Sequence, residues 1–78
     1  ENSKLCSEYK FLDFSRSVLF VNKILNPIEE LNHHPTLTIA YNRVKIHLFS
    51  FDVGGISNLD FELAREIELI ATASKAVR

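Results

Sequence analysis

The sequence predicts a single α+β domain in which an antiparallel sheet carries two helices on one face. Two patterns predict it: short runs in which apolar residues alternate, as in strands, and longer segments in which they recur every three or four positions, as in helices. Along the chain the order is strand, helix, strand, strand, helix, with no linker or repeat between them. The 78 residues allow one core, and so short a chain buries little of its surface, so we expect an oligomer.

Composition and charge exclude several classes of protein. The chain is 46% hydrophobic and 24% charged, with two Gly and two Pro, which is typical of a globular protein. Nine basic and ten acidic residues give a net charge of -1, and without a Lys or Arg cluster we expect no direct nucleic-acid binding. The longest apolar stretch, Val18–Val21, is far too short to span a membrane. Cys6 is the only cysteine, which excludes an intrachain disulfide and favours a reducing, cytoplasmic location.

The first half of the chain predicts a strand and a long helix. In the predicted strand Leu5–Phe11, the side chains Cys6, Glu8 and Lys10 alternate with Ser7, Tyr9 and Phe11. In the helix that follows, the apolar residues at helical spacing are Phe14, Val18, Val21, Leu25, Ile28 and Leu31. Asp13 or Ser15 can cap its N-terminus. Pro27 removes a backbone donor, so the helix either kinks there or restarts with Asn26 as a new N-cap; we favour a kink in a continuous helix.

The second half predicts two strands and a second helix. Asn32 together with His33-His34-Pro35 ends the first helix, because a residue before proline is disfavoured in the helical conformation. The strands are Thr36–Tyr41 and Val44–Phe51, joined by a turn at Asn42-Arg43, and the second strand turns Val44, Ile46, Leu48 and Ser50 towards the core. After Gly54-Gly55, Ser57 and Asp60 form a variant of the capping box that begins a helix from Asn58 to about Ala76.

One series of residues resembles a known family. The run Glu29-Glu30-Leu31-Asn32-His33-His34-Pro35 is followed in register by Tyr41, Val44, Ile46, Asp52, Gly54-Gly55, Asp60-Phe61 and Leu63-Ala64. Tyr9-Lys10-Phe11 and Asp13-Phe14 add the entry from a strand to a helix. Over about Leu5 to Ala73 the chain resembles the pterin-4a-carbinolamine dehydratases. The resemblance implies an α+β fold with three helices, of which this chain, a single domain over residues 1–78, lacks the N-terminal one.

The resemblance also implies an activity and a site. These enzymes dehydrate 4a-hydroxytetrahydropterin to quinonoid dihydropterin, which requires protonating the 4a-hydroxyl and removing the N5 proton. Histidine suits both steps, because its ordinary pKa of about 6.5 lets it hold or release a proton near neutrality. The implied catalytic residues are His33 and His34, and the implied substrate-binding residues are Glu29, Ser50, Phe51 and Asp60. No metal or organic cofactor is implied.

The implied partners are a reduced pterin and further copies of the same chain. The copies would form a dimer through sheet edges and a tetramer through the first helix, and a separate protein partner is a further option. Phe51 departs from the family pattern, which has a histidine or occasionally a tryptophan there. A phenyl ring can pack against a pterin but cannot transfer a proton. Two other functions therefore stay open: a non-catalytic dimerisation cofactor or assembly factor, and pterin binding without turnover.

Each candidate residue also has a purely structural explanation. His33 and His34 suit the C-terminal end of a helix dipole, and Asp60 suits the third position of a capped helix. Glu29 can be a solvated helix residue, and Tyr41 can pack on the sheet. His47 lies four residues before Phe51, roughly 13 Å along an extended strand, which favours a surface histidine over a replacement for the missing one. A zinc site made of the three histidines lacks the usual ligand spacing.

Overall fold

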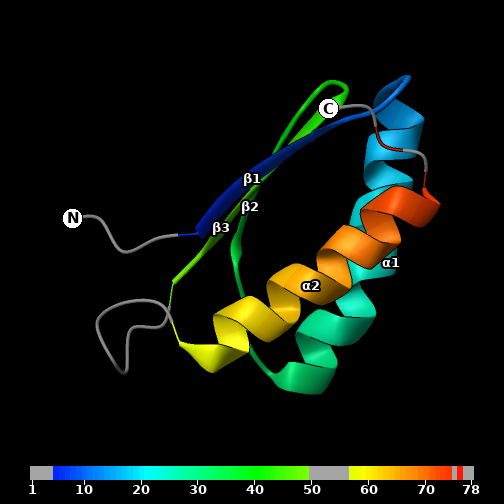
Figure 1. Ribbon diagram of the computed structural model, residues 1–78. Coiled ribbons are helices and arrows are strands. Elements are labelled where there is room, and N and C mark those ends of the chain that lie inside the picture. Colours follow the sequence, from blue (N-terminus) through cyan, green and yellow to red (C-terminus); the bar gives the residue numbers. More distant parts are fainter. Residues whose placement is uncertain (1–4, 50–56, 75, 77–78) are drawn as a thin grey trace.

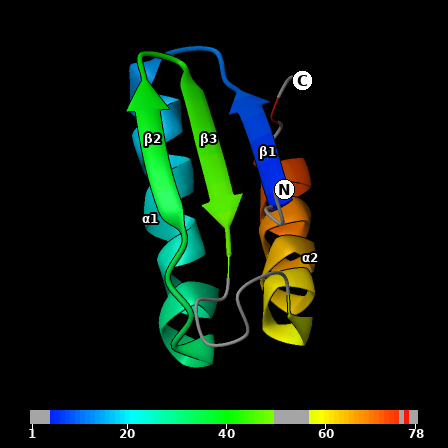
Figure 2. The same cartoon turned by 90° about the vertical axis from the view of Figure 1, so that its left-hand side faces the viewer.

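The computed structural model describes residues 5–49, 57–74 and 76. Within those residues the chain forms three strands and two helices in the predicted order (Figure 1). Their bounds are β1 Leu5–Lys10, α1 Phe14–Leu31, β2 Thr36–Ala40, β3 Arg43–Leu48 and α2 Asn58–Ala73. Both helices lie on one face of the sheet, α1 behind β2 and α2 behind β1 (Figure 2). The predicted α+β class and its element order are confirmed.

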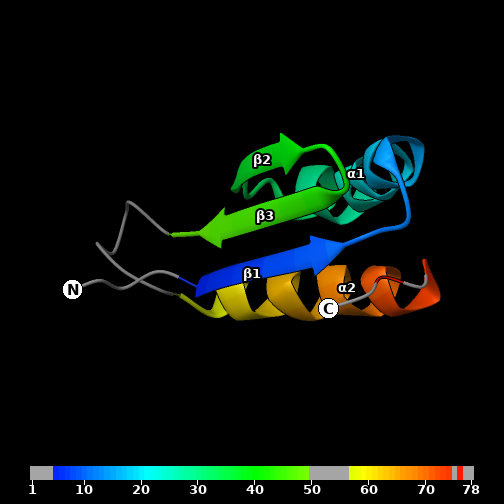
Figure 3. The same ribbon diagram turned by 90° about the horizontal axis from the view of Figure 1, so that it is seen from above.

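The sheet is antiparallel throughout, and its strand order is β1-β3-β2, so β3 lies between the other two (Figure 3). The hairpin between β2 and β3 has a two-residue turn at Tyr41-Asn42, one residue earlier than predicted, since Ala40 already pairs with Arg43. Tyr41 has a positive φ of 53°. Asn42 fixes this turn to the end of β1, because its side chain donates to the Phe11 carbonyl at 3.0 Å and its own carbonyl accepts from the Phe11 N–H at 2.8 Å.

The long helix α1 is continuous through Pro27, as predicted. Asp13 is its N-cap, and the carboxylate accepts a hydrogen bond of 2.9 Å from the Arg16 backbone N–H. At the other end Asn32 adopts the left-handed conformation, with φ 50° and ψ 45°, and its N–H donates to carbonyls of the last helical turn. Asparagine tolerates this conformation better than most residues. The helix therefore ends just before the two histidines.

The buried face of α1 coincides only in part with the apolar series that predicted the helix. The residues that the structure buries on this helix are Ser17, Phe20, Ile24, Pro27 and Ile28. Phe14 and Leu25, which belong to the apolar series at helical spacing, are 51% and 45% exposed. The helix carries two neighbouring apolar stripes, and the aromatic rings of β1 select between them. Phe20 packs against Tyr9 and Phe11, with ring centroids 5.4 Å and 4.9 Å apart.

The core lies between the sheet and the two helices. Its buried apolar residues are Tyr9, Phe11, Phe20, Ile24, Ile28, Val44, Ile46, Leu48, Leu63, Ile67 and Ala71. The predicted core face of β3 is confirmed, because Val44, Ile46 and Leu48 are all buried. Full burial of one such side chain contributes about 1.5–3 kcal/mol. Neither described helix is both long and apolar enough to span a lipid bilayer.

The second helix α2 begins where predicted and ends at Ala73, before the predicted boundary near Ala76. Its N-cap is Ser57, and the capping box with Asp60 is confirmed. Ser50 and Phe51, and with them the predicted C-terminal part of the second strand, lie outside the described residues, as does the Gly54-Gly55 break. The described part of the fold brings the end of α1 and the start of α2 together, and the candidate site is built there.

Candidate functional site

The left-handed turn at Asn32 directs the two histidines out of the end of α1. The His33 backbone N–H still donates to the Ile28 carbonyl, at 3.2 Å, so the chain stays fixed to the last turn of the helix. The His33 side chain is only 14% exposed. The predicted helix end at Asn32 is confirmed, and the left-handed conformation of Asn32 is what ends the helix there.

The His33 imidazole is held by a buried carboxylate from the other helix. Its Nε2 atom contacts Oδ1 of Asp60, whose side chain has no exposed surface. The second oxygen of the same carboxylate, Oδ2, accepts a hydrogen bond of 2.8 Å from the Ser57 backbone N–H and lies 3.5 Å from the Ser57 hydroxyl. A buried carboxylate must be paired, since its desolvation is costly. Asp60 therefore both caps α2 and positions His33, so its structural and functional explanations are compatible.

His34 forms a second and far more solvated pair. Its Nε2 atom lies 3.5 Å from Oε2 of Glu29, in the last turn of α1. The two side chains are 56% and 68% exposed, so water screens their attraction and the pair adds little stability. The consecutive histidines thus differ in environment. His33 is largely buried and faces a buried carboxylate, whereas His34 is exposed to solvent.

Two other residues that the sequence analysis considered, Tyr41 and His47, lie outside this site in the structure. Tyr41 follows the far end of β2, roughly 17 Å from the beginning of that strand at an extended rise per residue. His47 lies on β3 between neighbours on both sides and on the face opposite the buried Ile46 and Leu48. Neither contributes to the group formed by His33, His34, Glu29 and Asp60.

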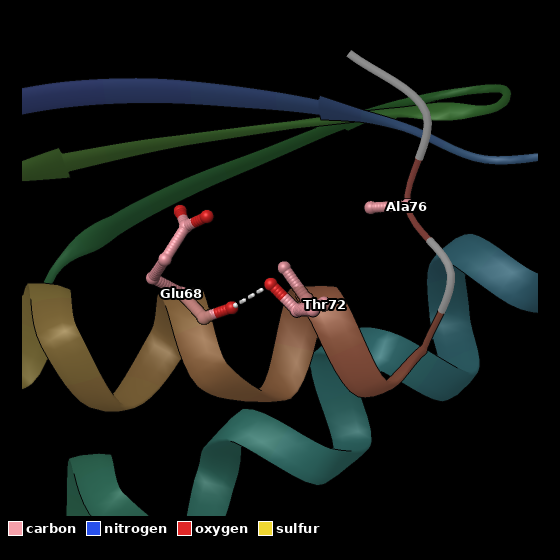
Figure 4. Close-up of a pocket in the computed structure, with 4 residues that line it drawn as sticks. Glu68, Thr72 and Ala76 are labelled. Atoms are coloured by element: carbon pink, nitrogen blue, oxygen red, sulfur yellow. Dashed lines mark hydrogen bonds between the residues drawn. The ribbon is translucent and has the colours of Figure 1, made fainter.

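A cavity of about 200 Å³ lies elsewhere, lined by Glu68, Ala71, Thr72 and Ala76 at the C-terminal part of α2 (Figure 4). Beside it the Tyr9 hydroxyl donates to Glu68 at 2.8 Å, which connects β1 to α2. Glu68 follows Asp60 by eight residues, or about 12 Å along a helix, so the cavity is separate from the histidines. In the described part of the chain no group of three or more His, Cys, Asp or Glu side chains could hold a metal ion.

Comparison with known proteins shows which family the chain resembles. The family model described as pterin 4 alpha carbinolamine dehydratase matches residues 1–70. A protein of Metallosphaera sedula is 43% identical over 68 residues, which are 87% of this chain and 71% of that protein. One of Trichormus variabilis is 44% identical over 70 residues, 90% of this chain and 75% of that protein. Both are named "Putative pterin-4-alpha-carbinolamine dehydratase".

Solved structures share the fold. The transcriptional coactivator/pterin dehydratase from Brucella melitensis has a TM-score of 0.84 and 35% identity, over 88% of this chain and 73% of that one. A pterin dehydratase-like protein identified as a RuBisCO assembly factor in the alpha-carboxysome has a TM-score of 0.76, over 91% of this chain and 83% of that one. Its identity is 16%, so it shows the fold alone. Sequence, fold and the His-His-Pro run lead to one conclusion: the chain belongs to the pterin 4 alpha carbinolamine dehydratase family.

Proposed function

We propose that this protein dehydrates a 4a-hydroxytetrahydropterin to the quinonoid dihydropterin, with His33 and His34 as the acid/base pair. The contact between His33 and the fully buried carboxylate of Asp60 carries the proposal. A carboxylate behind an imidazole both orients the ring and stabilises its protonated form. An ordinary helix cap needs no histidine there.

The reaction requires two proton movements at neighbouring atoms of the pterin. Removal of the N5 proton leaves an electron pair that forms the N5–C4a double bond. The 4a-hydroxyl takes up a proton and departs as water. Two adjacent histidines of opposite protonation state can supply both movements.

The environments of the two histidines suggest how they divide these steps. An ionised carboxylate can only accept a hydrogen bond, so Nε2 of His33 carries the proton that faces Asp60. We assign removal of the N5 proton to His33, because Asp60 stabilises the imidazolium that forms. His34 is exposed beside Glu29 and exchanges protons readily with water, so it suits the donor to the departing hydroxyl. Ser50 and Phe51 remain predicted substrate contacts.

A second candidate function follows from Phe51, where the family pattern has a proton-transferring residue. A chain without this group could bind a pterin without turnover, or act as a dimerisation cofactor or assembly factor. In the latter case the exposed apolar residues Phe14 and Leu25 of α1 offer a protein-binding surface.

Stopped-flow measurement of 4a-carbinolamine decay tests the proposal. The wild-type chain should accelerate the decay above the rate in buffer, and the double variant His33→Ala/His34→Ala should not. The matched control is His47→Ala, which removes the histidine outside the site and should keep the wild-type rate. Pterin binding without acceleration would favour the second function, and equal rates in the wild type and the double variant would exclude the acid/base assignment.

A further inference from the structure

The sheet face that the helices leave uncovered carries a second group of reactive side chains. The register of β1 and β3 sets Cys6 opposite His47, and that of β2 and β3 sets Thr36 on the other side of His47. Directly opposed residues share a face, with Cβ atoms about 4.5–5.5 Å apart. Cys6 and Thr36 are exposed and His47 is half-buried. The sole cysteine of the chain and the histidine outside the candidate site are therefore neighbours across two strands.

We propose that Cys6 and His47 together bind one soft metal ion, with Cu(I) as the ion that suits this pair. Thiolate and imidazole are donors that copper accepts readily. Cu(I) can be two-coordinate, with its two donors in a nearly linear arrangement. With bonds of about 2.0–2.3 Å on each side, the sulfur and nitrogen atoms would lie about 4 Å apart. Side chains on directly opposed strand positions can span that separation.

Other common metal ions fit the same face less well. Zinc in proteins takes three or four protein ligands, and the described residues offer no cluster of three. Calcium and magnesium need several oxygen donors. The carboxylate of this face nearest to Cys6 is Glu8, which lies opposite Lys45 and pairs with Arg43 at 3.6 Å. Its charge is compensated by the ion pair with Arg43.

The local contacts leave both donors available. Within the described chain, the side chains of Cys6 and His47 have no hydrogen-bond or ion-pair partner that a metal would have to displace. Metal-bound imidazoles usually bond a second group through the other ring nitrogen, which fixes the ring orientation. The Thr36 hydroxyl, directly across from His47 on β2, is placed to take that role.

The test is an anaerobic Cu(I) titration in competition with a chromophoric chelator, with the thiolate-to-copper absorption in the ultraviolet as a second readout. The wild type should bind one ion per chain. Cys6→Ser and His47→Gln should each weaken binding by about tenfold or more. Loss of a group that only supports a metal ligand already lowers metal affinity by about that factor. Cys6→Ser should also abolish the absorption band.

A matched control exchanges two residues of β3. The double variant Lys45→His/His47→Lys keeps the composition and the net charge, but moves the imidazole to a diagonal position about 7–8 Å from Cys6. It should bind as weakly as His47→Gln. The pair His33→Gln/His34→Gln should bind Cu(I) like the wild type. Wild-type affinity in His47→Gln or in the exchanged variant, one ion shared by two chains, or lost affinity in the His33/His34 variant would overturn the proposal.

Discussion

Asp60, in the first turn of α2, holds the imidazole of His33, which follows the end of α1 27 residues earlier in the chain. The same carboxylate accepts the backbone N–H of Ser57 and so closes the N-terminus of its own helix. One buried group thereby joins two helices, caps one of them and orients a candidate catalytic ring. The stability of the fold and the geometry of the site depend on the same side chain.

The replacement Asp60→Asn should separate these two roles. The amide oxygen can still accept the Ser57 N–H, but the charge that would stabilise a protonated His33 is lost, so we expect turnover to fall by about 10²-fold or more. Asp60→Ala should in addition destabilise the fold by about 3–5 kcal/mol, because it removes one partner of a buried pair. Urea denaturation of both variants measures the loss of stability, and stopped-flow kinetics measures the loss of turnover. Wild-type turnover in Asp60→Asn would contradict the positioning role.

The replacement His33→Ala should lower turnover by about 10² to 10⁴, the usual contribution of a positioned acid or base. Circular dichroism should show that the helices and strands are retained, because Asp60 keeps its Ser57 partners, although the loss of one partner of the buried pair lowers the free energy of unfolding. A His33→Ala variant with wild-type dehydratase activity would exclude this residue from the chemistry.

The replacement Phe51→His should restore a proton-transferring group at the position where the family pattern has one. We expect weak but measurable activity in the wild type and a gain of about tenfold or more in the variant, the lower part of the acid/base range. Reduced-pterin binding should change less than turnover, because a phenyl ring already packs against a flat ligand. If wild-type turnover equals that of three-histidine relatives, Phe51 has no such role.

A pair of neighbouring residues tests the observed face of α1. Ile24 is fully buried and Leu25 is 45% exposed. Ile24→Ala should lower the free energy of unfolding by about 2–5 kcal/mol, through lost burial and a cavity, and Leu25→Ala by less than about 1 kcal/mol. Urea denaturation of the two variants measures the difference. Equal losses would mean that the helix is rotated relative to the structure.

The exposed apolar residues and the two edge strands, β1 and β2, predict self-association. We expect a dimer through paired edges and a tetramer through α1, so that Leu25→Glu should reduce the tetramer to a smaller species while the fold remains. Asn26→Glu adds the same charge at an adjacent exposed position and is the matched control. Sedimentation velocity distinguishes the species. A wild-type chain that is only monomeric at micromolar concentration would refute this prediction.

The sequence by itself determined the features that depend on neighbouring residues. The sequence predicted the start of α1 at Asp13 or Ser15 and the start of α2 at Ser57. It also predicted that α1 continues through Pro27 and ends before the histidines, and that side chains alternate along β3. Each is set by backbone conformation and by hydrogen bonds within a few positions of the chain. The candidate residues His33, His34 and Asp60 were readable as well, though only through the resemblance to a family.

The tertiary structure decided what depends on distant partners. Which of two apolar stripes on α1 is buried was settled by the rings of Tyr9 and Phe11, which the helical period does not encode. That Asp60 holds His33 rather than His34, and that Cys6 faces His47, follows from how the helices pack and how the strands pair. Such pairings minimise the free energy of the whole packed core and sheet, so no local pattern fixes them.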